Sequence, residues 1–200
     1  MRPERLLLHV CCAPCSAYPV PALRELVSQV TGFFCNPNIQ PEAEHGRRLE
    51  ALESFAPALG LELITAAAPG AEDWAAAVRG REGERCRHCY ELRLRAAARE
   101  ARRLGCDAFS TTLLYSIHQK HELVRSVAGE VARAEGVPFL YRDLREGWAQ
   151  GGRAYRASGL YRQRYCGCLP SALERDAKRR APPTAAGTRT VVPGAQEPTS

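Results

Sequence analysis

The sequence of 200 residues predicts a single α/β domain of the doubly wound kind, with a mostly parallel sheet flanked by helices. Two observations lead to this prediction. Short apolar or β-branched runs alternate with longer segments of helical pattern, as in parallel strands joined by helical crossovers. The length also allows one core of ordinary size, so the fold does not need a disulfide scaffold.

Five short runs predict the strands, because each is apolar or β-branched and is bounded by Gly, Pro or Asp. In chain order they are "RLLLHV" (5–10), "VTGFFC" (30–35), "LELITAA" (61–67), "DAFSTTLL" (107–114) and "VPFLYRD" (137–143). Helices are expected between and after them, at about 17–29, 41–58, 71–79, 88–104, 117–135 and 146–158.

The last stretch is rich in Pro, Thr, Gly and Ala and has no apolar periodicity. It therefore buries too little surface to offset the entropy of ordering. We expect an α/β domain over 1–177 and a disordered tail over 178–200. The sequence contains no internal repeat, no GxGxxG after the first strand and no P-loop.

The charge and the cysteines narrow the class of protein. With 28 Lys and Arg against 22 Asp and Glu, the net charge is +6, which suits a nucleic-acid or phosphate partner. An Arg-rich and Ala-rich composition also follows from high genomic GC content, so the charge alone does not decide. No run approaches the roughly 20 apolar residues that span a bilayer, and the first apolar run is too short for a signal peptide. We expect a cytoplasmic protein whose thiols stay free for metal or redox work.

Three cysteines follow the first predicted strand. Cys11 and Cys12 come directly after it, and Cys15 lies near the start of the next helix. This places them at the carboxyl edge of the sheet, where parallel α/β folds bind their ligands. A buried cysteine that acts as a small hydrophobe explains one such thiol and not three.

A second group is the C-x-x-C pair Cys86 and Cys89, which leads into a helix whose N-terminus favours thiolates. Together with Cys11 and Cys12 it supplies four thiolates. Four thiolates suit a structural zinc site or a 4Fe-4S cluster. Zinc is the main alternative, although all-thiolate zinc sites usually use two C-x-x-C pairs.

A third group is "CGC", in which Cys166 and Cys168 flank Gly167. A disulfide between these positions closes a small ring, which the glycine makes accessible and which strain makes easy to reduce. A redox role is favoured over a structural one, and metal ligation is the second functional option. Cys35 and Cys106 are expected to be core thiols.

Six ordered segments of the sequence resemble the QueH-type epoxyqueuosine reductases, a cobalamin-independent family that completes queuosine in tRNA. The resemblance runs over about 5–171. The segments are "LLLHVCCAPCS", "FFCNPNIQP", "RCRHCYELRL", "FSTTLLYSIHQKHE", "FLYRDLREG" and "GLYRQRYCGCLPS".

The resemblance implies a Rossmann-like domain similar to the HUP group, and reduction of the epoxide of epoxyqueuosine in tRNA to queuosine. It implies that Cys11, Cys12, Cys86 and Cys89 hold a 4Fe-4S cluster and that Cys166 and Cys168 form a redox-active disulfide. The expected partners are a tRNA with a modified wobble guanine and an unidentified electron donor, with no membrane.

The family is also associated with a second, mononuclear metal ion, for which iron is the candidate here. Cys15 and Asp73 are the candidate ligands, and Asp143 is another candidate carboxylate. The stretch before Asp73 reads "TAAAPGAEDW" and lacks the acidic and aromatic run expected there.

Several polar side chains are candidates for substrate contacts. Recognition of a wobble base needs a splayed nucleotide that is stacked on aromatic or guanidinium planes. Each candidate also has an ordinary structural alternative, such as shaping a turn or lying on a solvated face. The candidates are Asn36, Asn38, Thr111, Thr112, His118, Tyr161, Arg162 and Arg164.

Three functions of different classes therefore follow from the sequence. The first is an iron-sulfur tRNA reductase. The second is a zinc-stabilised nucleic-acid-binding module without catalysis, and the third is a thiol-disulfide oxidoreductase that uses C-x-x-C and C-G-C.

Overall fold

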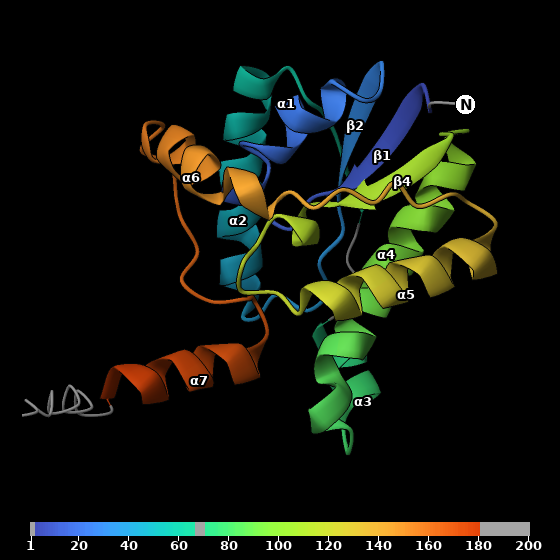
Figure 1. The fold of residues 1–200 in the computed structure, drawn as a ribbon. Coiled ribbons are helices and arrows are strands. Elements are labelled where there is room, and N and C mark those ends of the chain that lie inside the picture. Colours follow the sequence, from blue (N-terminus) through green and yellow to red (C-terminus); the bar gives the residue numbers. More distant parts are fainter. Residues whose placement is uncertain (1–2, 67–70, 181–200) are drawn as a thin grey trace, which may run out of the picture.

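The computed structural model describes residues 3–66 and 71–180 and places them in one α/β domain (Figure 1). Four parallel strands form one sheet in the order β3-β2-β1-β4, flanked by helices. The strands are β1 (Arg5–His9), β2 (Gln29–Phe34), β3 (Glu62–Thr65) and β4 (Ala108–Thr111). The predicted fold class is confirmed.

Helices lie at all six expected positions, and a seventh helix follows them. They are α1 (Pro19–Arg24), α2 (Glu42–Phe55), α3 (Ala71–Val78), α4 (Arg85–Arg103), α5 (His121–Glu135), α6 (Trp148–Arg156) and α7 (Leu169–Arg180). The seventh, α7, consists largely of the helix formers Ala, Leu, Glu, Lys and Arg, and its basic last turn suits a helix C-terminus. It reaches Arg180, so the rest of the expected tail lies outside the described residues.

The fifth expected strand, at 137–143, is reduced to one isolated parallel bridge between Phe109 and Phe139. Pro138 lacks a backbone N–H, so it accepts a hydrogen bond from Phe109 but donates none. Leu140 makes the second bond of the bridge, to the Phe109 carbonyl. The prediction of a full strand here was wrong, because a single bridge does not form a ladder.

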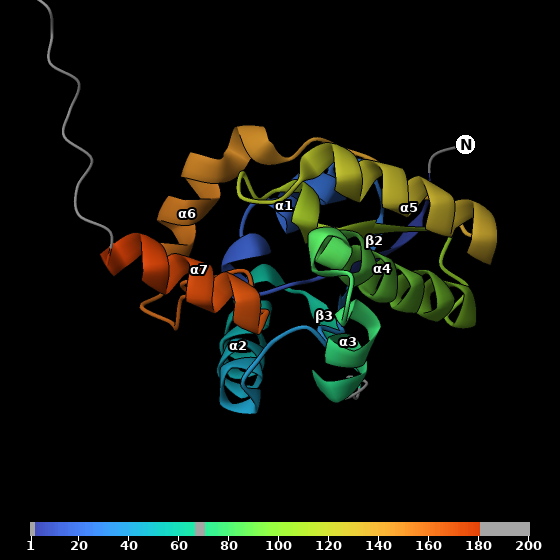
Figure 2. The ribbon, with the colours of Figure 1, turned by 90° about the horizontal axis from the view of Figure 1, so that it is seen from below.

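The core explains why the first strand is an unbroken apolar run. Leu6, Leu7 and Leu8 are all buried, as expected for a parallel strand covered on both faces. Helix α4 packs against β1, β4 and α5 (Figure 2). Its buried alanines, Ala97, Ala98 and Ala101, allow this close approach to the sheet. Among the described residues, no helix combines the length and the apolar character that a membrane span requires.

The strand order places a ligand site between β1 and β4. The chain passes from β1 to β2 on one side, and β4 joins β1 on the other side, so the carboxyl ends of β1 and β4 form a topological switch point. His9 and Thr111 are partners at these two ends. Immediately beyond them, the backbone N–H of Cys11 donates to the hydroxyl of Thr112 at 3.1 Å.

Candidate functional site

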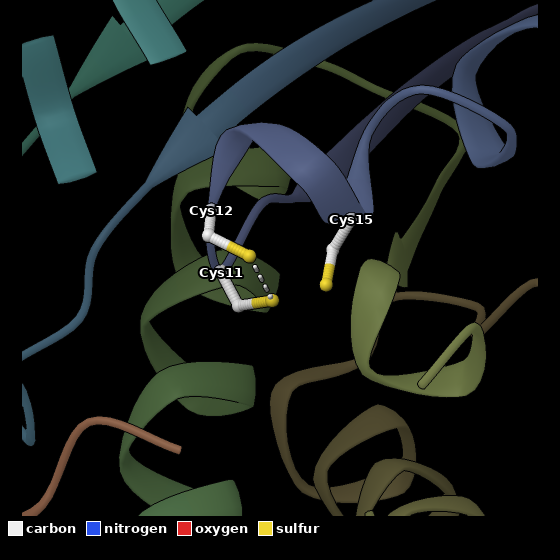
Figure 3. A group of neighbouring side chains, drawn as sticks. All are labelled: Cys11, Cys12 and Cys15. Atoms are coloured by element: carbon white, nitrogen blue, oxygen red, sulfur yellow. Dashed lines mark hydrogen bonds between the residues drawn. The ribbon is translucent and has the colours of Figure 1, made fainter. Parts of the chain in front are cut away.

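Three thiols meet in the loop after β1. The Sγ atoms of Cys11, Cys12 and Cys15 all lie within 4.8 Å of one another, and Figure 3 shows their side chains gathered on one side of the loop. A turn of 3-10 helix (Ala13–Cys15) closes through a hydrogen bond from the Cys15 N–H to the Cys12 carbonyl, which brings Cys15 back toward its neighbours. Such a group of soft donors is able to bind a metal ion.

The three thiols share their protons unequally. Hydrogen bonds from Cys12 and Cys15, and one from Thr112, lower the pKa of the Cys11 thiol against the effect of burial. Burial raises the pKa of Cys12, and its hydrogen bond to Cys11 adds to this. The hydrogen bonds to Cys11 and Cys12 raise the pKa of Cys15 in the same way. The thiolate form is therefore favoured most at Cys11 and least at Cys12 and Cys15.

The C-x-x-C pair starts helix α4 as expected. Cys89 is buried in a small cluster with Trp74, Val78 and Cys168, while Cys86 is partly buried. Burial raises the pKa of Cys89 to about 12, and the neighbouring thiols of Cys86, Cys166 and Cys168 add to the rise. The thiols of α4 and of the C-G-C segment are therefore electrostatic neighbours.

Arg93 connects the thiols electrostatically. It lies one turn after Cys89 on α4, is 1% exposed, and donates from Nε to the Cys89 carbonyl at 3.1 Å. Its positive charge interacts with the thiols of Cys89, Cys166 and Cys11, which belong to three different segments. Its Nη2 atom is buried and has no hydrogen-bond partner among the described residues. A buried guanidinium with a free donor fits a site that becomes negatively charged when it is filled.

Cys166 and Cys168 are free thiols on either side of Gly167, the first exposed and the second buried. Gly167 has φ +135°, where a side chain is strained, and a Cβ there would lie 3.0 Å from Asn38 Nδ2. Its carbonyl accepts a hydrogen bond from the Gln40 N–H at 2.8 Å. Gln119 donates to the Cys166 sulfur at 3.5 Å. The glycine therefore allows the segment to approach the loop after β2 closely.

A buried ion pair on α2 fixes the same segment. Arg48 donates to the carbonyls of Tyr165 and Cys166, each at 3.0 Å, and from Nε to Glu44 at 2.8 Å. Glu44 also accepts hydrogen bonds from Tyr161 at 2.6 Å and from Arg47 at 2.8 Å. Burial opposes the charge on Glu44, but these hydrogen bonds lower its pKa below the ordinary value. Helix α2 thus holds the backbone that carries Cys166.

Four of the thiols line one large cavity of about 1230 Å³. This is larger than the several hundred Å³ of ordinary ligand pockets, so a nucleoside with flanking groups fits. Cys11, Cys12, Cys15 and Cys166 reach it, and Gln163 lines it while donating to the Cys12 sulfur at 2.8 Å. Its remaining walls carry aromatic and basic side chains from α6, α7 and the segments before them.

The expected substrate residues fall into two groups. His118, Arg162 and Arg164 line the cavity. The other five do not line the cavity and pack within the fold. Asn36 donates to the Val10 carbonyl, and Asn38 is buried beside Gly167. Thr111 caps the next turn, Thr112 contacts Cys11, and Tyr161 donates to Glu44. Neither polar side-chain atom of Asn38 has a partner among the described residues.

Of the candidate ligands for a second metal, Cys15 belongs to the group of three thiols. The structure does not place either candidate carboxylate beside it. The side chain of Asp73 lies outside the described residues. Asp143 is not among the cavity residues and is bound to Arg145, which lowers its pKa to about 2.

Sequence reasoning missed the groups that surround the thiols. The spacing of Arg93 four residues after Cys89 on a predicted helix was a usable signal, because such positions share one helix face. Gln163 lies between Arg162 and Arg164, which were predicted substrate contacts, but of these three residues it is Gln163 that contacts a thiol. Nothing in the local sequence connects Glu44 and Arg48 to a segment more than a hundred residues later.

Comparisons with known proteins agree on one family. The family model described as "Epoxyqueuosine reductase QueH" matches residues 6–174. A protein of that name from Dehalococcoides mccartyi is 38% identical over 178 residues, which cover 89% of this chain and 98% of the relative. Another from Thermotoga maritima is 35% identical over 182 residues, which cover 86% and 93%.

A solved structure shares the fold. It is described as a predicted subunit of a tRNA methyltransferase from Methanocaldococcus jannaschii, with a TM-score of 0.54 and 11% identity. The match covers 76% of this chain and 74% of that chain. At this identity the likeness concerns the architecture alone.

Proposed function

Since the chain belongs to the epoxyqueuosine reductase QueH family, we propose that it reduces epoxyqueuosine in tRNA with a 4Fe-4S cluster as cofactor and a redox-active cysteine pair. One observation carries the finer part of this proposal. The buried charge of Arg93 interacts with thiols from three separate segments, and four thiols line a cavity large enough for a nucleoside.

We assign the cluster to Cys11, Cys12, Cys86 and Cys89. The donor set fits, because four thiolates from two segments are the usual ligands of such a cluster. The free Nη2 donor of Arg93 offers charge compensation beside the thiols of Cys11 and Cys89. When bound, the cluster supplies electrons one at a time. Cys15, within 4.8 Å of the two cluster thiols in its loop, is left over as a ligand for a second, mononuclear iron.

We assign the redox pair to Cys166 and Cys168. Conversion of the epoxide to the alkene takes two electrons and two protons and releases the oxygen as water. Oxidation of the two thiols to a disulfide supplies two electrons and two protons, so one turnover of this pair balances one reduction. An external electron donor then reduces the disulfide again. Gln119 and the Arg48 clamp hold Cys166 at the cavity, where the substrate is reduced.

The substrate side of the proposal is a splayed wobble nucleotide of a tRNA. His118, Arg162 and Arg164 are the sequence candidates that line the cavity, and we propose them as contacts to the base or its phosphates. Asn36, Thr111, Thr112 and Tyr161 support the site by holding its loops, and Asn38 is buried beside Gly167.

Anaerobic purification followed by visible spectroscopy and metal analysis tests the cofactor. The proposal predicts a brown protein with a broad visible band that dithionite bleaches, and with iron and sulfide in comparable amounts. A colourless protein with stoichiometric zinc would instead support a zinc-stabilised nucleic-acid-binding module. A colourless protein without metal would support a thiol-disulfide oxidoreductase.

A further inference from the structure

Exposed positive charges line one side of the cavity. Six basic side chains line the cavity, are exposed, and form no ion pair among the described residues. We call this set the basic rim: Arg153, Arg156, Arg162, Arg164, Lys178 and Arg179. Many other arginines of the chain are neutralised by acidic partners, as Arg95 and Arg99 are by Glu135. The rim charges are therefore available to a partner.

The rim comes from three elements on one side of the molecule. Arg153 and Arg156 belong to α6, and Lys178 and Arg179 to α7. Figures 1 and 2 show these two helices on the same side of the domain, joined by the segment that carries the other two arginines. In that segment Gln163 contacts the Cys12 sulfur, whereas Arg162 and Arg164 on either side of it are exposed. The chain thus places an amide that contacts a thiol between two exposed charges.

The arrangement of charge indicates the kind of partner. A nucleotide that leaves its stack to enter a cavity keeps its chain at the mouth, so phosphates lie on both its 5′ and its 3′ side. Cations on two separate helices at one mouth meet both sides at once. Arginine, which supplies five of the six rim charges, also matches phosphate oxygens with its planar fork. A docking patch for an acidic protein would not need its charges to line the cavity that holds the thiols.

We propose that α6 and α7 bind the RNA phosphates on opposite sides of the nucleotide that enters the cavity. This inference rests on the proposed function, since it takes the tRNA as the substrate. It assigns the positioning of the RNA to Arg153, Arg156, Lys178 and Arg179, which contact the backbone, and leaves recognition of the base to the cavity wall.

The test uses two double variants of the anaerobically purified holoenzyme, R153Q/R156Q on α6 and K178Q/R179Q on α7. The matched control is R79Q/R81Q, which removes two exposed arginines that do not line the cavity. The probe is an unmodified transcript of a tRNA with a wobble guanine. The measurement is its dissociation constant over a range of salt concentrations.

We expect each rim variant to bind about 10-fold more weakly at moderate salt. Each should also reduce the magnitude of the slope of log K against log salt by about 1.4 to 1.8, because each of the two phosphate contacts removed contributes about 0.7 to 0.9. The control should match the wild type in both quantities. Methylphosphonate at a single position 5′ or 3′ of the wobble nucleotide should remove the effect of one rim variant and not of the other.

Other results would contradict either the role of the basic rim or the proposed function. If the wild type binds the transcript and both rim variants bind like the control, the basic rim is not the RNA surface, and the proposed function stands. If only one helix contributes, binding from two sides is wrong. If the rim variants lose affinity only for flavodoxin, used as an acidic electron-donor probe, the rim docks a protein. If the wild type binds no tRNA at all, the proposed function fails as well.

Discussion

The buried charge pair of α2 allows a sharp prediction, because two adjacent arginines contact the same carboxylate in opposite environments. The side chains of Arg48 and Glu44 are 3% and 2% exposed, whereas that of Arg47 is 53% exposed. Arg48→Gln leaves the Glu44 charge buried without its main partner and removes two hydrogen bonds to the carbonyls of Tyr165 and Cys166. Arg47→Gln removes the ion pair from the exposed side of Glu44 and a contact of the guanidinium with the Tyr161 ring.

The magnitudes follow from burial. Breaking a buried pair by removing one partner costs about 3 to 5 kcal/mol. An exposed ion pair contributes about 0 to 1 kcal/mol. For a chain of 200 residues, each kcal/mol shifts the melting temperature by about 2 to 4 °C. We therefore expect Arg48→Gln to lower it by about 6 to 20 °C, and Arg47→Gln by less than about 4 °C.

Urea unfolding followed by circular dichroism measures these free energies, and the rate of Cys166 alkylation in native protein reports the C-G-C backbone. Arg48→Gln should change that rate even at temperatures where the variant is fully folded, because the Cys166 carbonyl loses its donor. Arg48→Lys should restore part of the stability, since it keeps the charge beside Glu44. Equal destabilisation by the Gln variants of Arg47 and Arg48 would refute the reasoning.

Further predictions concern the thiols and pH. Serine at any of the four proposed cluster cysteines should abolish most of the bound iron in an iron and sulfide assay, whereas Cys35→Ser and Cys106→Ser should retain it. Cys166→Ser and Cys168→Ser should each keep the cluster spectrum but lose repeated turnover, and normal turnover in either would remove the redox role. Because the pKa of Glu44 is lowered on folding, its stabilisation is complete above the unfolded pKa and is lost as pH falls through the folded pKa. The free energy of unfolding of the Glu44→Gln variant should therefore fall less steeply than that of the wild type as the pH is lowered into the acid range. An equal fall in both proteins would contradict this.

The sequence predicted most of the fold, because the signals involved are local. The unbroken apolar run of β1 marks a buried parallel strand, and Cys11 and Cys12 directly after it had to lie at the carboxyl edge. The fifth strand failed because Pro138 interrupts a pattern that is otherwise correct. Helix α7 was missed because its large apolar residues are few: Leu169 and Leu173 lie one turn apart but are exposed, and none of its residues is buried.

The sequence predicted only those site residues whose type and spacing are themselves characteristic of metal or redox chemistry. Cysteines at C-C, C-x-x-C and C-G-C spacing are visible in any sequence, and the structure gathers Cys11, Cys12 and Cys15 of the loop after β1 into one group. The side chains that contact the cysteine segments or place a charge near them are arginines, glutamines and a glutamate, which are common in any sequence. Arg48 reaches residues 165 and 166 only through tertiary packing, and no periodicity encodes such a contact.

The central claim is that this thiol-lined cavity removes an epoxide oxygen from a nucleoside in tRNA. The most direct measurement is mass spectrometry of nucleosides from tRNA that carries epoxyqueuosine, after incubation with the anaerobically reconstituted protein and a reductant. The account predicts loss of one oxygen atom to give queuosine, and no queuosine from the Cys166→Ser/Cys168→Ser double variant. Unchanged epoxyqueuosine, with a protein that retains its full iron and sulfide and binds the tRNA, would contradict it.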